Sequence, residues 1–260
     1  MQMAKGISLH IGLNAVDPAH YGGWDGALSA CEYDAKDMLA IANKRGFAAS
    51  TMLLTKQATV AAVSQAIQNA AKQLSKGDIF FLTYSGHGGQ VPDTNQDEAD
   101  RMDETWVLYD RQLVDDELYK LYSTFKSGVR IVVLSDSCHS GTVIRATPPW
   151  EASQPKIRVM PTNVGKETYR KNKATYDGIQ KANAGAESIA LKATVVLISG
   201  CQDNQVSLDG SRNGLFTGTM KKVWNNGKFA YGYRRFRDSI VTRMPPTQTP
   251  NYYVIGAANP

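Results

Sequence analysis

Short apolar runs alternate with segments of helical periodicity along most of the chain, and this alternation constrains the fold more than any other feature. The strand-like runs lie at residues 6–13, 50–54, 79–84, 106–109, 130–134, 193–199 and 252–255. Helical patterns cover residues 27–45, 59–74, 115–125, 215–224 and 231–244. Strand–helix–strand alternation predicts an α/β fold with a mostly parallel central sheet flanked by helices on both faces.

Two of the apolar runs end in residues suited to nucleophilic catalysis. The first is followed by Tyr-Ser-Gly-His-Gly-Gly at 84–89, and the second by Ser-Asp-Ser-Cys-His-Ser-Gly at 135–141. In open α/β sheets, ligands bind at the carboxyl edge of the parallel strands. One strand end therefore offers a base and the other a thiol, which are the two groups that cysteine-based nucleophilic catalysis needs.

Cys138 is the predicted nucleophile and His87 the predicted base. A thiol ionises near neutral pH only beside a base or a positive field. His139 adjoins Cys138, but neighbouring side chains on extended backbone point to opposite faces. His10 lies inside a strand, so we interpret it as a core residue. The backbone N–H groups of Gly88 and Cys138 are the predicted donors to a developing oxyanion.

Asp136 lies two positions before Cys138, so the two side chains are predicted to point into the same cleft. A carboxylate beside a thiolate would raise the pKa of the thiol and hinder its ionisation. Asp136 is better suited to binding a cationic substrate group, because carboxylates pair strongly with Arg and Lys.

The net charge of +5 is concentrated in a basic segment between residues 150 and 192. Basic segments can bind nucleic acid, but this one carries no recognisable motif and little aromatic interleaving, so no nucleic-acid partner is predicted. A solvated basic loop and a protease-sensitive loop are the two interpretations that stay open. The segment lacks clear periodicity, and loops of this length are usually functional or disordered.

Other features of the composition bear on location. No apolar run approaches 18 residues, so no membrane span or membrane partner is predicted. The first residues lead directly into a strand without a signal-peptide pattern. Three scattered cysteines cannot form a disulfide framework and fit a reducing environment. We therefore expect a cytoplasmic protein.

The motifs, taken in order, resemble those of the caspase-like cysteine peptidases, specifically the metacaspases and their prokaryotic counterparts, the orthocaspases. Residues 84–88 resemble the histidine motif of that family and residues 136–141 its cysteine motif. Residues 27–35 are similar to the early helix that contributes an aspartate to the S1 pocket, and residues 199–203 to the strand end after the central loop.

The resemblance covers most of the chain and implies a caspase-like (caspase-hemoglobinase) fold in a single domain over residues 1–260. Its parts would be a large-subunit-like region (1–144), a basic linker or processing loop (145–192) and a small-subunit-like region (193–260).

The resemblance also implies an activity, namely hydrolysis of peptide bonds after Arg or Lys by a Cys138–His87 dyad. The S1 pocket would use Asp34, Asp136 and Ser85, with Asp203 as a weaker third carboxylate. The partners would be peptides and proteins with basic P1 residues, acted on by a monomer. We expect self-cleavage in the basic loop, and the candidate sites are Arg145, Arg170, Lys171 and Lys173.

Some members of this family depend on calcium bound by acidic residues from three segments. Asp103, Asp115 and Asp116 match two of those segments, and carboxylate oxygens suit Ca²⁺. The third segment has Arg145 where an aspartate is expected, and a cation there weakens Ca²⁺ binding. We therefore expect no required cofactor. Asp115 and Asp116 are explained equally well as acids at a helix N-terminus.

Two other classes of function stay open at this point. A catalytically silent caspase-like adaptor or signalling module would keep the fold without the chemistry, but the dyad and both S1 aspartates are present. A metal-dependent hydrolase would use His87 with the acidic loop, and the clustered histidines typical of such sites are missing.

Overall fold

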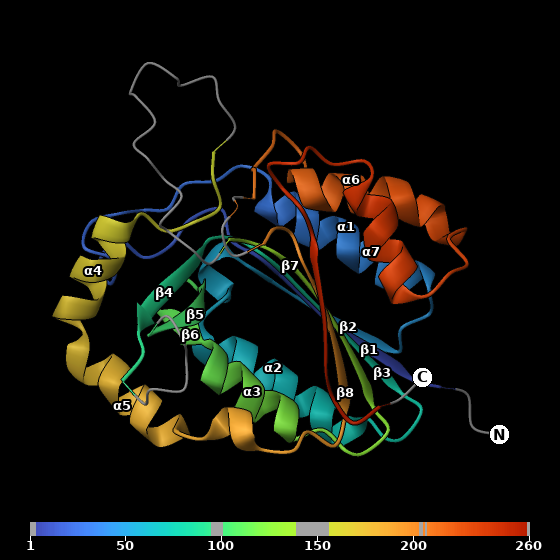
Figure 1. Cartoon of the computed structure of the whole chain (residues 1–260), viewed down its shortest axis with the longest axis horizontal. Helices are drawn as coiled ribbons and strands as arrows, with labels where there is room; N and C mark the ends of the chain where they lie inside the picture. The colour runs from blue at the N-terminus through green and yellow to red at the C-terminus, as the bar shows by residue number, and fades with distance from the viewer. Residues whose placement is uncertain (1–3, 95–100, 139–155, 203–204, 206, 259–260) are drawn as a thin grey trace.

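The computed structural model describes residues 4–94, 101–138, 156–202, 205 and 207–258 (Figure 1). Its main sheet has the strand order β2-β1-β3-β7-β8-β9. These strands are β1 (Gly6–Gly12), β2 (Ala49–Leu54), β3 (Ile79–Ser85), β7 (Arg130–Asp136), β8 (Thr194–Ser199) and β9 (Asn251–Gly256). All neighbouring pairs are parallel except β8 with β9. The predicted mostly parallel sheet is confirmed.

Helices cover both faces of this sheet (Figure 1). One face carries α1 (Cys31–Lys44), α6 (Leu215–Trp224) and α7 (Tyr233–Val241), and the other carries α2 (Val60–Gln73) and α3 (Asp115–Ser123). Each face has its own apolar core, and Phe80, Leu82 and Ile131 belong to the α2–α3 side. Met38, Leu134 and Phe216 belong to the opposite core. Strands buried on both faces read as continuous apolar runs, which is why the sequence revealed them.

A small antiparallel sheet follows β3 and was not predicted as a unit. It consists of β4 (Gly88–Pro92), β5 (Met102–Val107) and β6 (Gln112–Val114), in that order. The sequence indicated only a short extended piece at 106–109 and an acidic loop from 93 to 104. Asp103 and Glu104 lie within β5, where cross-strand pairing with β4 outweighs the low strand propensity of acids.

The prediction of a loop through the basic segment is wrong over residues 162–183. The chain there forms α4 (Thr162–Lys171) and α5 (Lys173–Asn183), which lie beside the small sheet (Figure 1). The fully buried Tyr176 packs with Val91 and Val114. Few residues of these helices are apolar, so the sequence reads as a polar loop although the apolar residues lie on one helical face.

Short 3-10 helices lie at Thr55–Gln57, Ala186–Ser188 and Asn225–Gly227. Among the helices of the described residues, none combines the length and the apolar character that crossing a membrane requires.

Candidate active site

The register between β3 and β7 brings the two catalytic candidates to the same height. Ser85 and Asp136 are register partners at the carboxyl ends of these parallel strands. His87 and Cys138 each lie two residues farther along. Both side chains are buried, with exposed fractions of 6% for His87 and 0% for Cys138.

His87 is held in one tautomer by a backbone contact. Its Nε2 lies 2.9 Å from the carbonyl oxygen of Gly26. Since a carbonyl oxygen only accepts hydrogen bonds, Nε2 carries the proton and Nδ1 presents its lone pair. Nδ1 is buried and has no hydrogen-bond partner among the described residues. The ring of Trp24 packs at 4.7 Å from the imidazole and fixes its orientation.

Burial lowers the pKa of His87 to about 4. The hydrogen bond to Gly26 and the charge of Asp209 act in the opposite direction, while the charge of Arg158 lowers the pKa further. The imidazole is therefore neutral at pH 7, which is the form that accepts a proton.

The turn between β3 and β4 is shaped by Tyr84. Its hydroxyl donates to the carbonyl oxygens of His87 at 2.6 Å and Val107 at 3.1 Å, and its ring stacks on Trp106 with centroids 4.5 Å apart. A Cβ on Gly86 would lie 2.6 Å from the Tyr84 hydroxyl oxygen. Only glycine fits at that position, because the hydroxyl is held by two carbonyl groups.

Two backbone N–H groups converge on a single carbonyl beside Cys138. The N–H groups of Gly88 and Cys138 donate to the carbonyl oxygen of Arg158 at 3.1 and 3.0 Å. The Cys138 thiol lies against the backbone N–H of Ser207 and packs with Val159. The two predicted oxyanion donors thus point at one oxygen, and that oxygen belongs to the chain itself.

The guanidinium of Arg158 is completely buried among three carboxylates. Its Nη1 lies 3.0 Å from Asp136 Oδ2. Its Nη2 lies 2.8 Å from Asp34 Oδ2 and 2.9 Å from Asp209 Oδ1. Nη1 also donates to Ser85 Oγ at 2.7 Å. We refer to Asp34, Asp136 and Asp209 as the carboxylate pocket.

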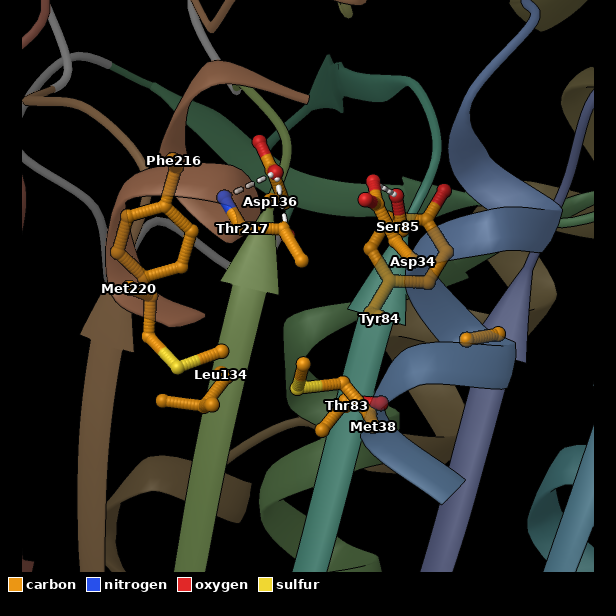
Figure 2. Close-up of a pocket in the computed structure, with 11 residues that line it drawn as sticks. Asp34, Met38, Thr83, Tyr84, Ser85, Leu134, Asp136, Phe216, Thr217 and Met220 are labelled. Carbon is orange, nitrogen blue, oxygen red and sulfur yellow. Dashed lines mark hydrogen bonds between the residues drawn. The ribbon is translucent and has the colours of Figure 1, made fainter. Parts of the chain in front are cut away.

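Elements from both halves of the chain hold the carboxylates in place. Figure 2 shows Ser85 beside Asp34, and Thr217 beside Asp136, at the ends of β3 and β7. The Ser85 hydroxyl donates to Asp34 at 2.7 Å, and both the N–H and the hydroxyl of Thr217 donate to Asp136, at 3.0 and 2.7 Å. These donors compensate for part of the desolvation of the charges.

Asp209 joins the pocket to the start of α1. Its carboxylate accepts the backbone N–H groups of Ser29 at 2.7 Å and Ala30 at 3.2 Å. Such N–H groups have no partner within a helix, and an acid at this end also interacts favourably with the helix dipole. Asp209 therefore caps α1 from a distance of about 180 residues in sequence.

Among the described residues, one cation faces three carboxylates in this pocket. Burial raises the pKa of Asp34 to about 6, and the nearby Asp136 raises it as well, while Arg158 lowers it. Three buried carboxylates around one cation repel each other strongly in a medium of low dielectric constant. Without a cation the pocket would have to take up protons or water.

The backbone around Arg158 crosses the site as an extended strand. Ile157 pairs antiparallel with Leu208, and Arg158 N–H donates to the carbonyl oxygen of Ser207 at 2.9 Å. On the other side Val159 pairs with Gly88, whose carbonyl oxygen accepts the N–H of residue 160 at 2.8 Å. Hydrogen bonds therefore hold the segment on both sides of the Arg158 carbonyl.

Most of the predicted site residues meet around Arg158. These are Cys138, His87, Gly88, Asp34, Asp136 and Ser85. Asp203, Arg145 and His139 lie outside the described residues. Arg170 and Lys171 lie on α4 and Lys173 on α5, where their side chains pair with Glu167 and Asp177.

The sequence reasoning missed Arg158 and Asp209, together with the supporting Ser207, Asn213 and Thr217. The sequence holds one indication that Arg158 is buried. Arg158 is the single cation within the short apolar stretch Ile-Arg-Val-Met at 157–160, in an otherwise polar segment. A lone charge in a short strand-like run indicates a buried cation with a specific partner.

The acidic residues between the motifs lie on β5 and at the start of α3. Asp103 and Asp116 are buried, and Asp115 has its pKa raised to about 9 by burial and by the neighbouring Glu104 and Asp103. Within the described parts of the chain, no three His, Cys, Asp or Glu side chains form a metal-binding group. The expectation that no cofactor is required stays a prediction.

A neutral imidazole, a buried thiol and paired backbone donors at the carboxyl edge of a parallel sheet define a site of the cysteine-nucleophile class. Residues 13–254 match the family model described as the caspase domain. The chain belongs to the caspase domain family.

Within this family, the chain is similar to fungal metacaspases. The chain is 30% identical over 251 residues to metacaspase-1 of Kluyveromyces lactis, covering 82% of this chain and 56% of that protein. It is 32% identical over 253 residues to metacaspase-1A of Aspergillus fumigatus, covering 83% of this chain and 59% of the relative. The chain thus spans less than two thirds of the length of these relatives.

Solved structures agree with the fold. The crystal structure of a Geobacter sulfurreducens protein matches with a TM-score of 0.89 and 56% identity, covering 98% of this chain and 95% of that one. Caspase-1 from Spodoptera frugiperda matches with a TM-score of 0.57 at 9% identity, over 97% and 86% of the two chains. The second likeness concerns the fold alone, and the predicted caspase-like fold is confirmed.

Proposed function

We propose that this protein is a cysteine endopeptidase that cleaves peptide bonds after Arg or Lys. The observation that carries the proposal is the guanidinium of Arg158, buried against three carboxylates while its own carbonyl oxygen accepts the N–H groups of Gly88 and Cys138. A substrate residue in the same place would have a basic side chain in the carboxylate pocket and a carbonyl carbon beside the thiol.

The residues around the Arg158 carbonyl suggest how the reaction proceeds. Nδ1 of His87 takes the proton of the Cys138 thiol, and the thiolate attacks the substrate carbonyl carbon. The oxyanion that forms accepts the N–H groups of Gly88 and Cys138, which need no reorganisation to stabilise it. His87 then protonates the leaving amine, and water hydrolyses the thioester with His87 as base.

The carboxylate pocket is our proposed S1 pocket, with Ser85 as an additional acceptor for the substrate guanidinium. In this proposal Asp209, rather than Asp203, supplies the third carboxylate, because its Oδ1 lies 2.9 Å from Nη2 of Arg158. A buried acidic pocket excludes acidic P1 residues, since a fourth carboxylate would add an uncompensated buried charge.

We propose further that calcium is not required and that the protein acts as a monomer. Activity that stays constant between EGTA and added Ca²⁺ supports the first point, and strong activation by Ca²⁺ would contradict it. Light scattering after size-exclusion chromatography tests the second. The exposed edge strand β9, with Tyr253, Val254 and Ile255 on its surface, is where a dimer would form by strand pairing.

The experiment for the main proposal measures turnover of fluorogenic peptides that differ only in P1. We expect turnover with Arg and Lys, none with Asp, and none with any substrate for Cys138→Ala. A well-folded wild-type protein that turns over no Arg or Lys substrate, with or without Ca²⁺, would favour the alternative of a catalytically silent adaptor.

A further inference from the structure

Residues 156–160 occupy the active site in the way a substrate would. The Lys156 carbonyl oxygen accepts the N–H of Asp209 at 2.7 Å, and Ile157 pairs with Leu208. The side chain of Lys156 also donates to the carbonyl oxygen of Ala27 at 2.7 Å. Every residue from 156 to 160 therefore contacts a part of the chain that surrounds the Cys–His pair.

We propose that the Arg158–Val159 peptide bond is the site at which this protein cuts itself, and that the uncut segment keeps other substrates out of the carboxylate pocket. This inference rests on the proposed function. It places the cut at Arg158 rather than at Arg170, Lys171 or Lys173, because those three residues lie on helices and regular helical backbone cannot enter an extended binding cleft.

The side chain and the carbonyl of Arg158 satisfy two independent requirements for a scissile P1 residue. The guanidinium contacts all three carboxylates at 2.8 to 3.0 Å. The carbonyl oxygen accepts both backbone N–H groups at the nucleophile. Val159, on the leaving side, packs with Cys138 and pairs through its backbone with Gly88, which directly follows His87.

The chemical step needs only water as co-reactant. The Cys138 sulfur bonds to the Arg158 carbonyl carbon, and the C–N bond to Val159 breaks as His87 returns the thiol proton to the leaving nitrogen. Water then hydrolyses the thioester, leaving a carboxylate on Arg158, an amine on Val159 and a regenerated thiol. The pocket opens once the new carboxyl terminus leaves it.

Complete burial of Arg158 makes the cut intramolecular. Its exposed fraction is 0%, so the active site of a second molecule cannot reach the bond while the segment is seated. The half-time of cutting should therefore be independent of protein concentration. The Cys138→Ala protein should stay intact when a small amount of wild-type enzyme is added.

The test is intact mass spectrometry with N-terminal sequencing of wild type, Cys138→Ala, Arg158→Gln, Arg158→Lys and Arg170→Gln. We expect wild type and Arg170→Gln to give a fragment beginning at Val159 at the same rate. Cys138→Ala and Arg158→Gln should not give this fragment. Arg158→Lys keeps a basic side chain in the pocket and is expected to be cut at the same bond. This second variant keeps the test valid if Arg158→Gln does not fold.

Turnover of a fluorogenic Arg peptide by the same wild-type sample separates the two proposals. Turnover together with an uncut Arg158–Val159 bond, or with a cut at another basic residue that Arg158→Gln leaves unaffected, would overturn the self-cleavage site and leave the peptidase proposal standing. A half-time that shortens in proportion to concentration would overturn the intramolecular cut. No turnover and no cutting would refute the proposed function itself.

Discussion

Ser85 of β3 and Asp136 of β7 are register partners at the last rung of a parallel pair, and each contacts the same guanidinium. His87 and Cys138 lie two residues beyond this pair, past the ends of the strands. The N–H groups of Gly88 and Cys138 donate to the same Arg158 carbonyl oxygen, so the two chain segments still lie side by side there. In the function we propose, substrate recognition and catalysis both depend on the pairing of these two strands.

The first prediction concerns this Cys–His pair. Replacing either Cys138 or His87 by Ala should lower kcat for an Arg peptide by about 10³-fold or more, because the two groups act as a unit. For the same reason the double variant should be no slower than the worse single variant. Steady-state kinetics with active-site titration would measure this. Effects that multiply in the double variant would show that the residues act separately.

The second prediction concerns Gly214 and Gly218, at the start of α6 and within it. A Cβ on Gly214 would lie 2.6 Å from Cζ of Arg158, whereas a Cβ on Gly218 meets nothing closer than 3.5 Å. Overpacking of this kind costs about 1–3 kcal/mol, so Gly214→Ala should lower kcat/KM for Arg peptides by about 5- to 150-fold.

Gly218→Ala serves as the matched control for this change. Gly218 lies within α6, where alanine is the better helix former, so this variant should keep full activity and a melting temperature at least equal to that of wild type. Equal losses of activity in both variants would show that the contact with the guanidinium is not the cause.

The third prediction concerns Asp209. Asp209→Asn keeps the shape of the side chain but removes one of three charges facing the substrate cation. A charged hydrogen bond contributes about 1.5–3 kcal/mol, so kcat/KM for Arg peptides should fall by about 10- to 150-fold. Asp238→Asn, on the exposed side of α7, is the control and should change nothing measurable. An unaffected Asp209→Asn protein would remove this residue from the pocket.

The fourth prediction concerns the pH dependence of stability. The pKa of Asp115 is raised to about 9 in the folded chain, whereas an unfolded Asp titrates near 4. The folded state therefore binds more protons than the unfolded state between these values, and stability falls as the pH rises through that window. Asn does not titrate, so Asp115→Asn does not lose stability in this way. The melting temperature of the variant minus that of wild type should therefore increase as the pH rises from about 4 to about 9.

Thermal unfolding across this pH range checks the prediction, with Asp238→Asn as the control. A difference in melting temperature that is constant with pH would show that Asp115 titrates normally. Addition of Ca²⁺ to wild type at pH 8 extends the test, since an ion bound to this carboxylate would raise the melting temperature of wild type and not that of Asp115→Asn.

The parts of the site that strands carry could be predicted from the sequence. Cys138 and His87 each follow an apolar run within a few residues, and parallel strands place their carboxyl ends together. Asp136 follows from the same alternation, whereas the prediction for Ser85 rests on the family resemblance. In each case a local pattern determines the position of the side chain, and the sheet joins the patterns.

The parts that depend on long-range contacts could not be predicted in this way. Asp209 reaches the pocket by capping α1, a contact between segments 179 residues apart, and no local pattern encodes it. Helices α4 and α5 have only a narrow apolar stripe, so they read as a loop. Arg158 lies in the same basic segment, just before α4. Its ion pairs with Asp34 and Asp136 depend on the assembled sheet and have no local sequence pattern.

The position of β8 determines what a cut at residue 158 would do to the molecule. β8 pairs with β7 on one side and with β9 on the other, so the two pieces of a cut chain share one continuous ladder of hydrogen bonds. The nicked protein should keep the size of the intact one and separate only in denaturant. After separation, rebuilding the β7–β8 pairing would be an encounter between two chains, whereas the intact chain folds alone. Self-cutting would thus make folding irreversible at low concentration.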